Sequence, residues 1–155
     1  MRKKGQFQLS FGMIFSIIII IAIVGVSFYV ITKFIGTSKC TEIALFYDSL
    51  KSHTEKAWRS TINKDTFTFA LPSGIEEVCF GDISQSKRDE IKKEFVNSNG
   101  NVFLYPARKA CDSTLSSIKL EHVTIPSFFC VKAEDNKISI KTSKTQFEPL
   151  VTISE

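Results

Sequence analysis

An uninterrupted apolar run from Phe11 to Ile31 constrains this chain more than any other feature. No charged residue occurs between Gly5 and Thr32. As an α-helix rising about 1.5 Å per residue, the run would span roughly 31 Å, close to the hydrocarbon thickness of a bilayer. The sequence therefore predicts three parts: a basic cytoplasmic N-terminus at residues 1–10, a transmembrane helix at 11–35 and an extracytoplasmic head domain at 36–155.

The charges beside the run predict its orientation. The topology signal consists of three cations that precede the run: Arg2, Lys3 and Lys4. Because cytoplasmic flanks of membrane helices carry an excess of Lys and Arg, we expect the N-terminus in the cytoplasm and the head domain outside. The alternative is a secretory signal cut near the small, polar residues 35–38. The run is longer than a typical signal core of about 7–15 residues, so we favour an anchor retained in the cell membrane.

Most of the positive net charge belongs to this orientation signal. The chain carries +4, with 20 Lys and Arg against 16 Asp and Glu. Three of those cations precede the run, which leaves 17 against 16 for the rest of the chain. The head domain is therefore nearly neutral and lacks a basic stripe, so we expect no nucleic-acid partner. The expected partners are the lipid bilayer and either a second copy of the chain or another envelope protein.

Four cysteines follow the apolar run: Cys40, Cys79, Cys111 and Cys130. An even number of cysteines in a small exported domain predicts disulfide bonds. Three pairings exist. Cys79 and Cys130 both lie in strand-like apolar segments, which favours that pair and leaves Cys40 with Cys111. A zinc site is a poorer interpretation, because no Cys-x-x-Cys occurs and neither histidine has ligand spacing to a cysteine.

Apolar residues at helical spacing predict an amphipathic helix from about Ser38 to Thr61. They are Ile43, Phe46, Tyr47, Leu50, Ala57 and Trp58. This helix either continues the membrane helix or restarts after a break at Gly36-Thr37-Ser38, and we favour near-continuity. We expect its aromatic side chains to pack against a sheet rather than to bind a ligand.

The rest of the sequence has the alternation of β-strands. Residues 66–71 and 75–80 flank the turn Pro72-Ser73-Gly74 and predict a β-hairpin. A second hairpin is predicted around Asp135-Asn136. The remaining expected elements are a capped helix at 86–96 with Ser86 as N-cap, strands at 101–105 (ended by Pro106) and 117–123, the hairpin strands at 128–132 and 137–141, and an edge strand at 150–153.

The predicted fold class is therefore α+β. A transmembrane helix runs into an amphipathic helix, and a small, mostly antiparallel sheet of five or six strands with one short helix follows. A head domain of this length is enough for one modest core, which the disulfides would reinforce.

The sequence contains no recognisable catalytic constellation. His53 lies beside the apolar stripe of a helix, and His122 alternates with Leu120 in an expected strand. Glu76 and Glu77 are adjacent in a strand, so their side chains would point to opposite faces. Asp82, Asp89 and Glu90 lack the alternate spacing of a calcium loop, and Ser73 lacks the Gly-x-Ser-x-Gly context of a nucleophile. We expect no catalytic, metal-binding or cofactor-binding residue, and we predict that the protein is not an enzyme.

The N-terminus Arg2-Lys3-Lys4-Gly5-Gln6, which runs directly into a hydrophobic helix, resembles the class III signal of archaeal type IV pilin-like proteins. The resemblance implies that a prepilin peptidase cuts between Gly5 and Gln6. It also implies that the helix stays on the mature subunit, anchors it and later packs in a filament core. Members of that family usually have Glu five residues into the mature chain, where this sequence has Ser10.

Two segments of the head domain also resemble small single-pass membrane proteins of archaea that have no assigned activity. These are Leu71-Pro-Ser-Gly-Ile-Glu-Glu-Val-Cys-Phe80 and Asn101-Val-Phe-Leu-Tyr-Pro106. The sequence thus predicts a membrane-anchored structural or interaction protein, with a pilin-like subunit as its sharpest form. The alternative is a membrane-tethered accessory or binding module that engages an envelope protein or a ligand. An exported hydrolase is the remote alternative.

Overall fold

The structure is a computed structural model that describes residues 11–155. The signal residues Arg2, Lys3, Lys4, Gly5 and Gln6, and Ser10 after them, lie outside the described residues. The chain divides into two compact units, Met1–Gly36 and Thr37–Glu155, and we describe each by itself. We call the second unit the head.

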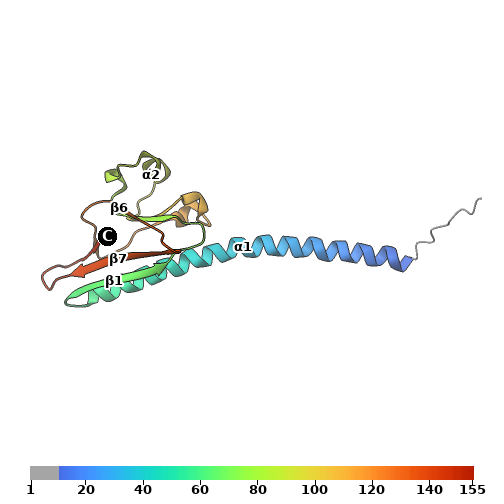
Figure 1. The fold of residues 1–155 in the computed structure, drawn as a ribbon, viewed down its shortest axis with the longest axis horizontal. Helices are drawn as coiled ribbons and strands as arrows, with labels where there is room; N and C mark the ends of the chain where they lie inside the picture. Colours follow the sequence, from blue (N-terminus) through green and yellow to red (C-terminus); the bar gives the residue numbers. More distant parts are fainter. Residues whose placement is uncertain (1–10) are drawn as a thin grey trace, which may run out of the picture. The chain divides into compact units, whose positions relative to one another are not determined.

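Helix α1 (Phe11–Arg59) is the first element of the chain (Figure 1). It is assigned as helical through Gly36, so the predicted alternative of a break at that position is wrong. The helix ends where Ser60 caps it, with its N–H donating to the carbonyl oxygens of Lys56 and Ala57 at 3.2 and 3.3 Å. Its first part is the predicted membrane helix, and its last part is the predicted amphipathic helix of the head.

The head contains two four-stranded sheets rather than the single sheet that we expected. Sheet A has the order β1-β7-β8-β5, with strands Asn63–Ala70, Lys137–Lys144, Val151–Ser154 and Val123–Thr124. Sheet B has the order β4-β3-β2-β6, with strands Ser117–Ile118, Val102–Tyr105, Glu77–Phe80 and Phe129–Lys132. All pairs are antiparallel except β5 with β8. The α+β class and the mostly antiparallel pairing are confirmed.

The main core lies where α1 and the two sheets meet. Its buried side chains come from α1 (Ile43, Phe46, Tyr47, Leu50), from sheet A (Phe69, Ile138, Ile140, Ile153), from sheet B (Val78, Phe80, Val102, Leu104) and from loops (Leu71, Ile75, Leu120). Phe46 and Tyr47 of the predicted aromatic stripe are therefore core, as expected, whereas Trp58 lies outside both cores and stacks on His122. Burial of such apolar surface is the main favourable term in folding.

A second, smaller core covers the opposite face of sheet B. Helix α2 (Asp89–Glu94) and the segment after it place Ile91 and Phe95 against Phe103 and Cys79. The predicted N-cap of this helix was wrong, because Arg88 holds that position and Ser86 ends the preceding 3-10 helix η1 (Ile83–Gln85). Two further 3-10 helices, η2 (Ala107–Lys109) and η3 (Ser113–Ser116), lie after β3.

The predicted hairpin of residues 66–71 and 75–80 does not form. The turn exists, with the N–H of Ile75 donating to the carbonyl oxygen of Pro72 at 3.1 Å. The chain then passes from sheet A into sheet B, so that β1 pairs with β7 while β2 lies between β3 and β6. All four residues of β2 are buried, which requires a central strand covered on both faces.

The expected strand at 117–123 is split into β4 and β5. Between them, the side chain of Asn101 takes the place of a neighbouring strand: it accepts from the N–H of Leu120 at 2.7 Å and donates to its carbonyl oxygen at 2.9 Å. His122 then adopts a φ of 61°, a conformation that ends a regular strand. His122 therefore lies in a loop, not in the strand we predicted.

The C-terminal strands are placed differently from the prediction. The turn at Asp135-Asn136 forms, but β6 and β7 belong to different sheets and are joined only by a bridge between Glu134 and Lys137. The last strand, β8, lies between β7 and β5 and is therefore interior rather than at an edge. β3 matches the strand that was expected to end at Pro106.

Candidate functional site

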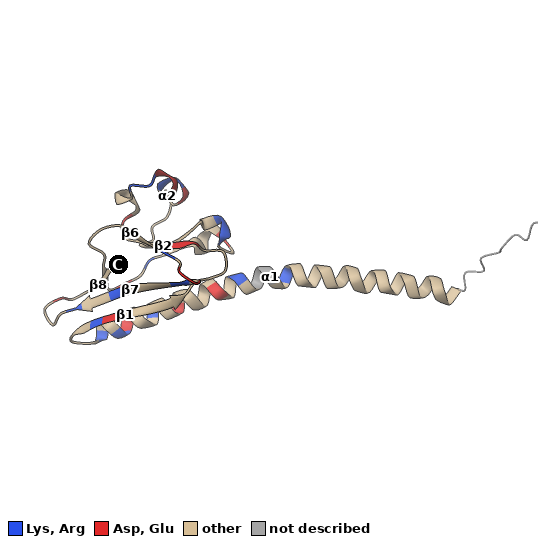
Figure 2. Ribbon diagram, viewed as in Figure 1, with Lys and Arg blue, Asp and Glu red and all other residues tan. Residues whose placement is uncertain are grey.

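The first part of α1 is the most exposed apolar surface of the described residues. Every residue from Phe11 to Phe34 is exposed. Figure 2 shows no charged residue on this part of the helix before Lys33. Within residues 11–155, α1 is the one helix long and apolar enough to cross a membrane by length and composition.

The serine and threonine hydroxyls of this segment donate to carbonyl oxygens of the same helix. The hydroxyl of Ser16 donates to the carbonyl oxygen of Gly12 at 2.8 Å, and that of Ser27 donates to Ile23 at 2.7 Å. Thr32 donates to the carbonyl oxygen of Tyr29 at 2.9 Å. In hydrocarbon, a polar group without a partner is costly, so such internal hydrogen bonds suit a segment surrounded by lipid.

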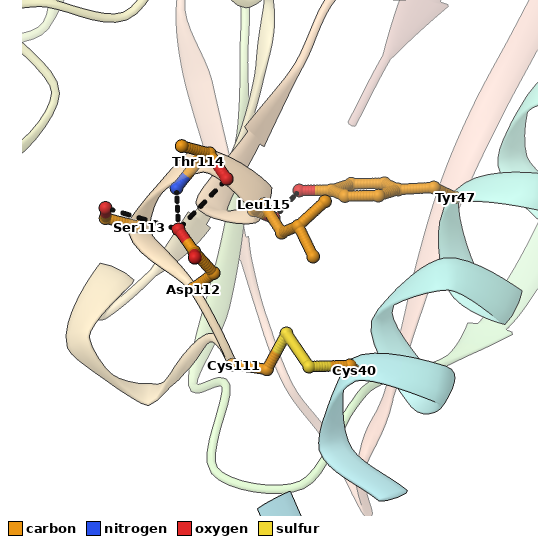
Figure 3. Close-up of a disulfide and its surroundings, with 7 residues drawn as sticks. All are labelled: Cys40, Tyr47, Cys111, Asp112, Ser113, Thr114 and Leu115. Atoms are coloured by element: carbon orange, nitrogen blue, oxygen red, sulfur yellow. Dashed lines mark hydrogen bonds between the residues drawn. A yellow bond between two sulfur atoms is a disulfide. The ribbon is translucent and has the colours of Figure 1, made fainter. Parts of the chain in front are cut away.

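Both disulfides lie in the head. Cys79 on β2 is opposite Cys130 on β6, with 3.9 Å between their Cα atoms, and the two are bonded. Cys40 on α1 is bonded to Cys111, with a Cα–Cα distance of 5.1 Å (Figure 3). This is the pairing that the strand pattern favoured. Disulfides of this kind fit a domain that folds in an oxidising compartment.

The segment after Cys111 is attached to α1 by more than the disulfide. The hydroxyl of Tyr47 donates to the carbonyl oxygen of Leu115 at 2.7 Å (Figure 3). Burial raises the pKa of Tyr47 well above its usual value. Asp112 caps η3 by accepting from the N–H of Thr114 at 2.8 Å, and hydrogen bonds from the backbone and hydroxyl of Thr114 lower the pKa of Asp112.

Both histidines that the sequence offered as candidates for catalysis contact aromatic rings. His53 lies against Phe67 and Phe69, with ring centroids 4.3 and 5.4 Å away, and its Nδ1 is buried with no hydrogen-bond partner among the described residues. His122 is stacked on Trp58 with centroids 3.8 Å apart. Both imidazole rings are thus positioned by packing against aromatic side chains.

A hollow of about 390 Å³ lies beside His122, between α1 and the loop 119–122. Lys51 and Glu55 line it from the helix, and Lys119 and Glu121 line it from the loop. The two cations and two carboxylates balance, and Glu55 is also paired with Arg59. The lining of the hollow is therefore mixed in charge.

A buried carboxylate lies next to the Cys79–Cys130 disulfide. Glu77 is 4% exposed, shares a face of β2 with Cys79, and accepts a hydrogen bond of 2.5 Å from the guanidinium of Arg88. The Arg88 guanidinium also lies over the Tyr105 ring, 5.3 Å from its centroid. Both cysteine sulfurs near Glu77 are in the disulfide bond, so this group does not offer free thiolates to a metal ion.

The remaining residues considered as candidate site residues have structural roles, as helix caps, first-turn carboxylates or packing residues. Asp82 caps η1, and hydrogen bonds from the backbone N–H and hydroxyl of Ser84 lower its pKa. Asp89 and Glu90 lie in the first turn of α2, where carboxylates are favourable. Phe128 and Phe129 are half-buried and pack against the smaller and the main core, respectively.

Two of these arrangements could not be predicted from the sequence. Alternation along β2 places Glu77 on the same face as Cys79, but nothing local identifies Arg88 as the partner of Glu77. The stack of Trp58 on His122 joins residues 64 positions apart, and no spacing rule connects them. Comparison of the chain with protein-family models, with curated proteins and with solved structures found no match.

Proposed function

We propose that the chain is a single-pass protein of the cell membrane, with its N-terminus in the cytoplasm and its head outside. The observation that carries the proposal is the exposed segment Phe11–Phe34, whose serine and threonine hydroxyls donate to carbonyl oxygens within the helix. The three preceding cations support the orientation, and the two disulfides support an oxidising compartment for the head.

In this location the protein has a structural role or binds other envelope proteins. The most specific version of the proposal is a pilin-like subunit. The support for that form is the resemblance of residues 2–6 to a class III signal. A long N-terminal helix followed by a small head with antiparallel sheets agrees with the plan of such subunits. Cleavage would remove residues 1–5 and leave Gln6 at the start of the apolar helix.

The intact mass of the protein from native membranes tests this form directly. A chain that begins at Gln6 supports it, and a chain that still begins at Met1 or Arg2 overturns it. Gly5→Leu is expected to block the cut and leave membrane insertion unchanged. The matched control is Gly25→Leu: a Cβ added at Gly25 meets nothing within 4 Å, so this variant is expected to be cut normally.

Orientation is tested separately by protease digestion of intact spheroplasts. Digestion of the head from outside, with the N-terminal residues protected, supports the proposed topology. Protection of the head in intact spheroplasts, with digestion only after lysis, overturns it. Release of the whole protein into the medium would identify a cleaved secretory signal instead.

A tethered binding module is the second candidate, and one observation favours it. The head has strongly exposed apolar side chains, among them Phe147 (86% exposed) and Ile62 (68%). The two lie in neighbouring turns, because Asn63 after Ile62 pairs with Lys144 just before the turn of Phe147. If these side chains bind a partner, the double variant Phe147→Ser, Ile62→Ser would lose cross-linked complexes in membranes while keeping the stability of the head.

A further inference from the structure

Strands β6 and β7 begin as a hairpin and then separate. Asp135 and Asn136 have φ of 48° and 62°, as the central residues of a tight two-residue turn do. Glu134 and Lys137 exchange both backbone hydrogen bonds at 2.9 Å. In a regular hairpin, the next hydrogen-bonded pair would join Lys132 to Ser139. Here β6 pairs with β2 and β7 pairs with β1, so the strands diverge directly after the turn (Figure 1).

The divergence leaves backbone groups of β6 without partners. The N–H of Ala133 donates to the carbonyl oxygen of Glu76 at 2.8 Å, which shows which residues of β6 face β2. Because the direction alternates along a strand, Val131 and Phe129 also face β2, whereas Cys130 and Lys132 direct their N–H and C=O groups away from it. Within residues 11–155, no backbone partner is found for these outward groups.

Strand β7 has a similar gap on its side that faces away from β1. The N–H of Leu71 donates to the carbonyl oxygen of Asn136 at 2.8 Å, so alternate residues of β7 face β1 and Ser139 faces the other way. On that side β8 pairs with β7 only from Lys141 onward. The backbone of Ser139 therefore has no strand partner on this side in the described part of the chain.

A groove of about 720 Å³ lies between β6 and β7. It is lined by Cys130, Val131 and Lys132 on β6, by residues 137–139 on β7, and by Glu155. This volume is within the range of about 300–1,000 Å³ that is usual for ligand sites. The Cys79–Cys130 disulfide ties β6 to β2, so the free edge is held in position before anything binds.

We propose that this groove binds an extended segment of a partner polypeptide, which adds as a strand to the free edge of β6. The outward groups of Cys130 and Lys132 are two residues apart, about 7 Å along the strand, which is the interval at which an extended backbone repeats its donors and acceptors. Ser139 lies across the groove from them and supplies a further donor and acceptor.

The lining of the groove defines the chemistry of the segment. Half-buried Val131 is the apolar side chain of the groove that a ligand can reach, because the Ile138 side chain is buried in the main core. A side chain of the bound segment that packs beside Val131 is therefore apolar. The charges around the groove are mixed, with Lys132 and Lys137 beside Glu134, Asp135 and Glu155. The segment is therefore selected by its extended backbone and by an apolar residue beside Val131 rather than by net charge.

The test uses the full-length, ¹⁵N-labelled protein in detergent micelles and one defined probe, the acetylated and amidated peptide Thr-Val-Thr-Val-Thr. Strand addition predicts saturable shifts and slowed hydrogen exchange at the amides of Cys130, Lys132 and Ser139. Lys132→Pro removes one outward donor from an edge strand, where proline is tolerated, and is expected to weaken binding at least about fivefold. No saturable change at these amides at millimolar peptide would overturn the proposal.

Lys64→Pro is the matched control. Lys64 is an exposed lysine of the edge strand β1 and directs its N–H away from β7 in the same way. It lies outside the groove, so binding should stay within about twofold of the wild type. Equal weakening by the two variants would contradict the proposed site.

A second measurement leaves the protein unchanged and so does not depend on whether a proline variant folds. Two isomers of the probe are compared, one N-methylated on both valines and the other on its third and fifth residues, which block opposite edges of the strand. Strand addition predicts that their affinities differ at least about fivefold. Equal affinities would mean that no strand pairs with β6. The inference stands on the head alone, so its failure is distinguishable from a failure of the anchoring proposal.

Discussion

The hydroxyl of Tyr47 on α1 donates a hydrogen bond of 2.7 Å to the carbonyl oxygen of Leu115. This bond and the Cys40–Cys111 disulfide attach the same segment to α1 at two places, two helical turns apart.

Tyr47→Phe is expected to destabilise the head by about 1 kcal/mol, because it removes the donor and leaves the Leu115 carbonyl without it. Urea denaturation of the full chain in micelles measures the change. The control is Tyr29→Phe, in the exposed apolar segment, which should leave the denaturation midpoint of the head unchanged. Identical midpoints for the two variants would contradict the role of this hydrogen bond.

The same residue predicts a fall in stability at high pH. Burial holds the folded-state pKa of Tyr47 above the ordinary value of 10.0, so the contribution is fully present below pH 10. It is lost as the pH rises above 10, because the unfolded chain then releases a proton that the folded chain retains. The slope of unfolding free energy against pH between 10 and 11 should be smaller in Tyr47→Phe than in the wild type.

The disulfide pairing is directly measurable, because lysines separate all four cysteines. A non-reducing tryptic digest should join the peptide of residues 40–51 to that of 110–119, and the peptide of 65–87 to that of 120–132. Any other combination would refute the bonds described here. By the loop-entropy model, closing the chain across the 71 residues from Cys40 to Cys111 stabilises the head by about 4 kcal/mol. The double variant Cys40→Ser, Cys111→Ser should lose most of that amount.

Arg88→Ala is expected to cost about 1–2 kcal/mol. The change leaves the buried Glu77 carboxylate without its cation, and partial exposure of the Arg88 side chain (44%) reduces the penalty below that of a fully buried pair. Glu77→Gln in the Arg88→Ala background should recover part of the loss, since it removes the unpaired charge. A double-mutant cycle by urea denaturation measures the coupling, and an additive cycle would show that the ion pair contributes nothing.

The features of the fold that could be predicted from sequence are those decided by neighbouring residues. Helical spacing from Ile43 to Ala57 predicted the buried face of α1, and Asp135-Asn136 predicted a turn, since both residues tolerate positive φ. The pairing of Cys79 with Cys130 followed from the strand character of both segments. In each case, the deciding side chains lie within one element or at its end.

The partners of the strands could not be predicted in the same way. Alternation in residues 66–71 shows which side chains face inward, but it does not show that β1 pairs with β7, whose first residue Lys137 lies opposite Ala70. Likewise, the Asn101 side chain ends β4 by bonding Leu120, 19 residues away. Such pairings depend on how the two sheets share one core, and that information is spread over the whole chain.

The Cys40–Cys111 disulfide has a mechanical consequence for the membrane-anchored protein that we propose. A pull transmitted along α1 enters the head a few residues before Cys40, since the second unit begins at Thr37. Cys40 is covalently bonded to Cys111 in the loop after β3. Tension is therefore transmitted to the strands of the head before the contacts between α1 and the main core have to break. The disulfide thus places the load on a covalent bond rather than on packing. Without it, the hydrogen bond from the Ser73 N–H to the Glu42 carboxylate and the core contacts of Ile43 and Phe46 would be the first to resist the pull.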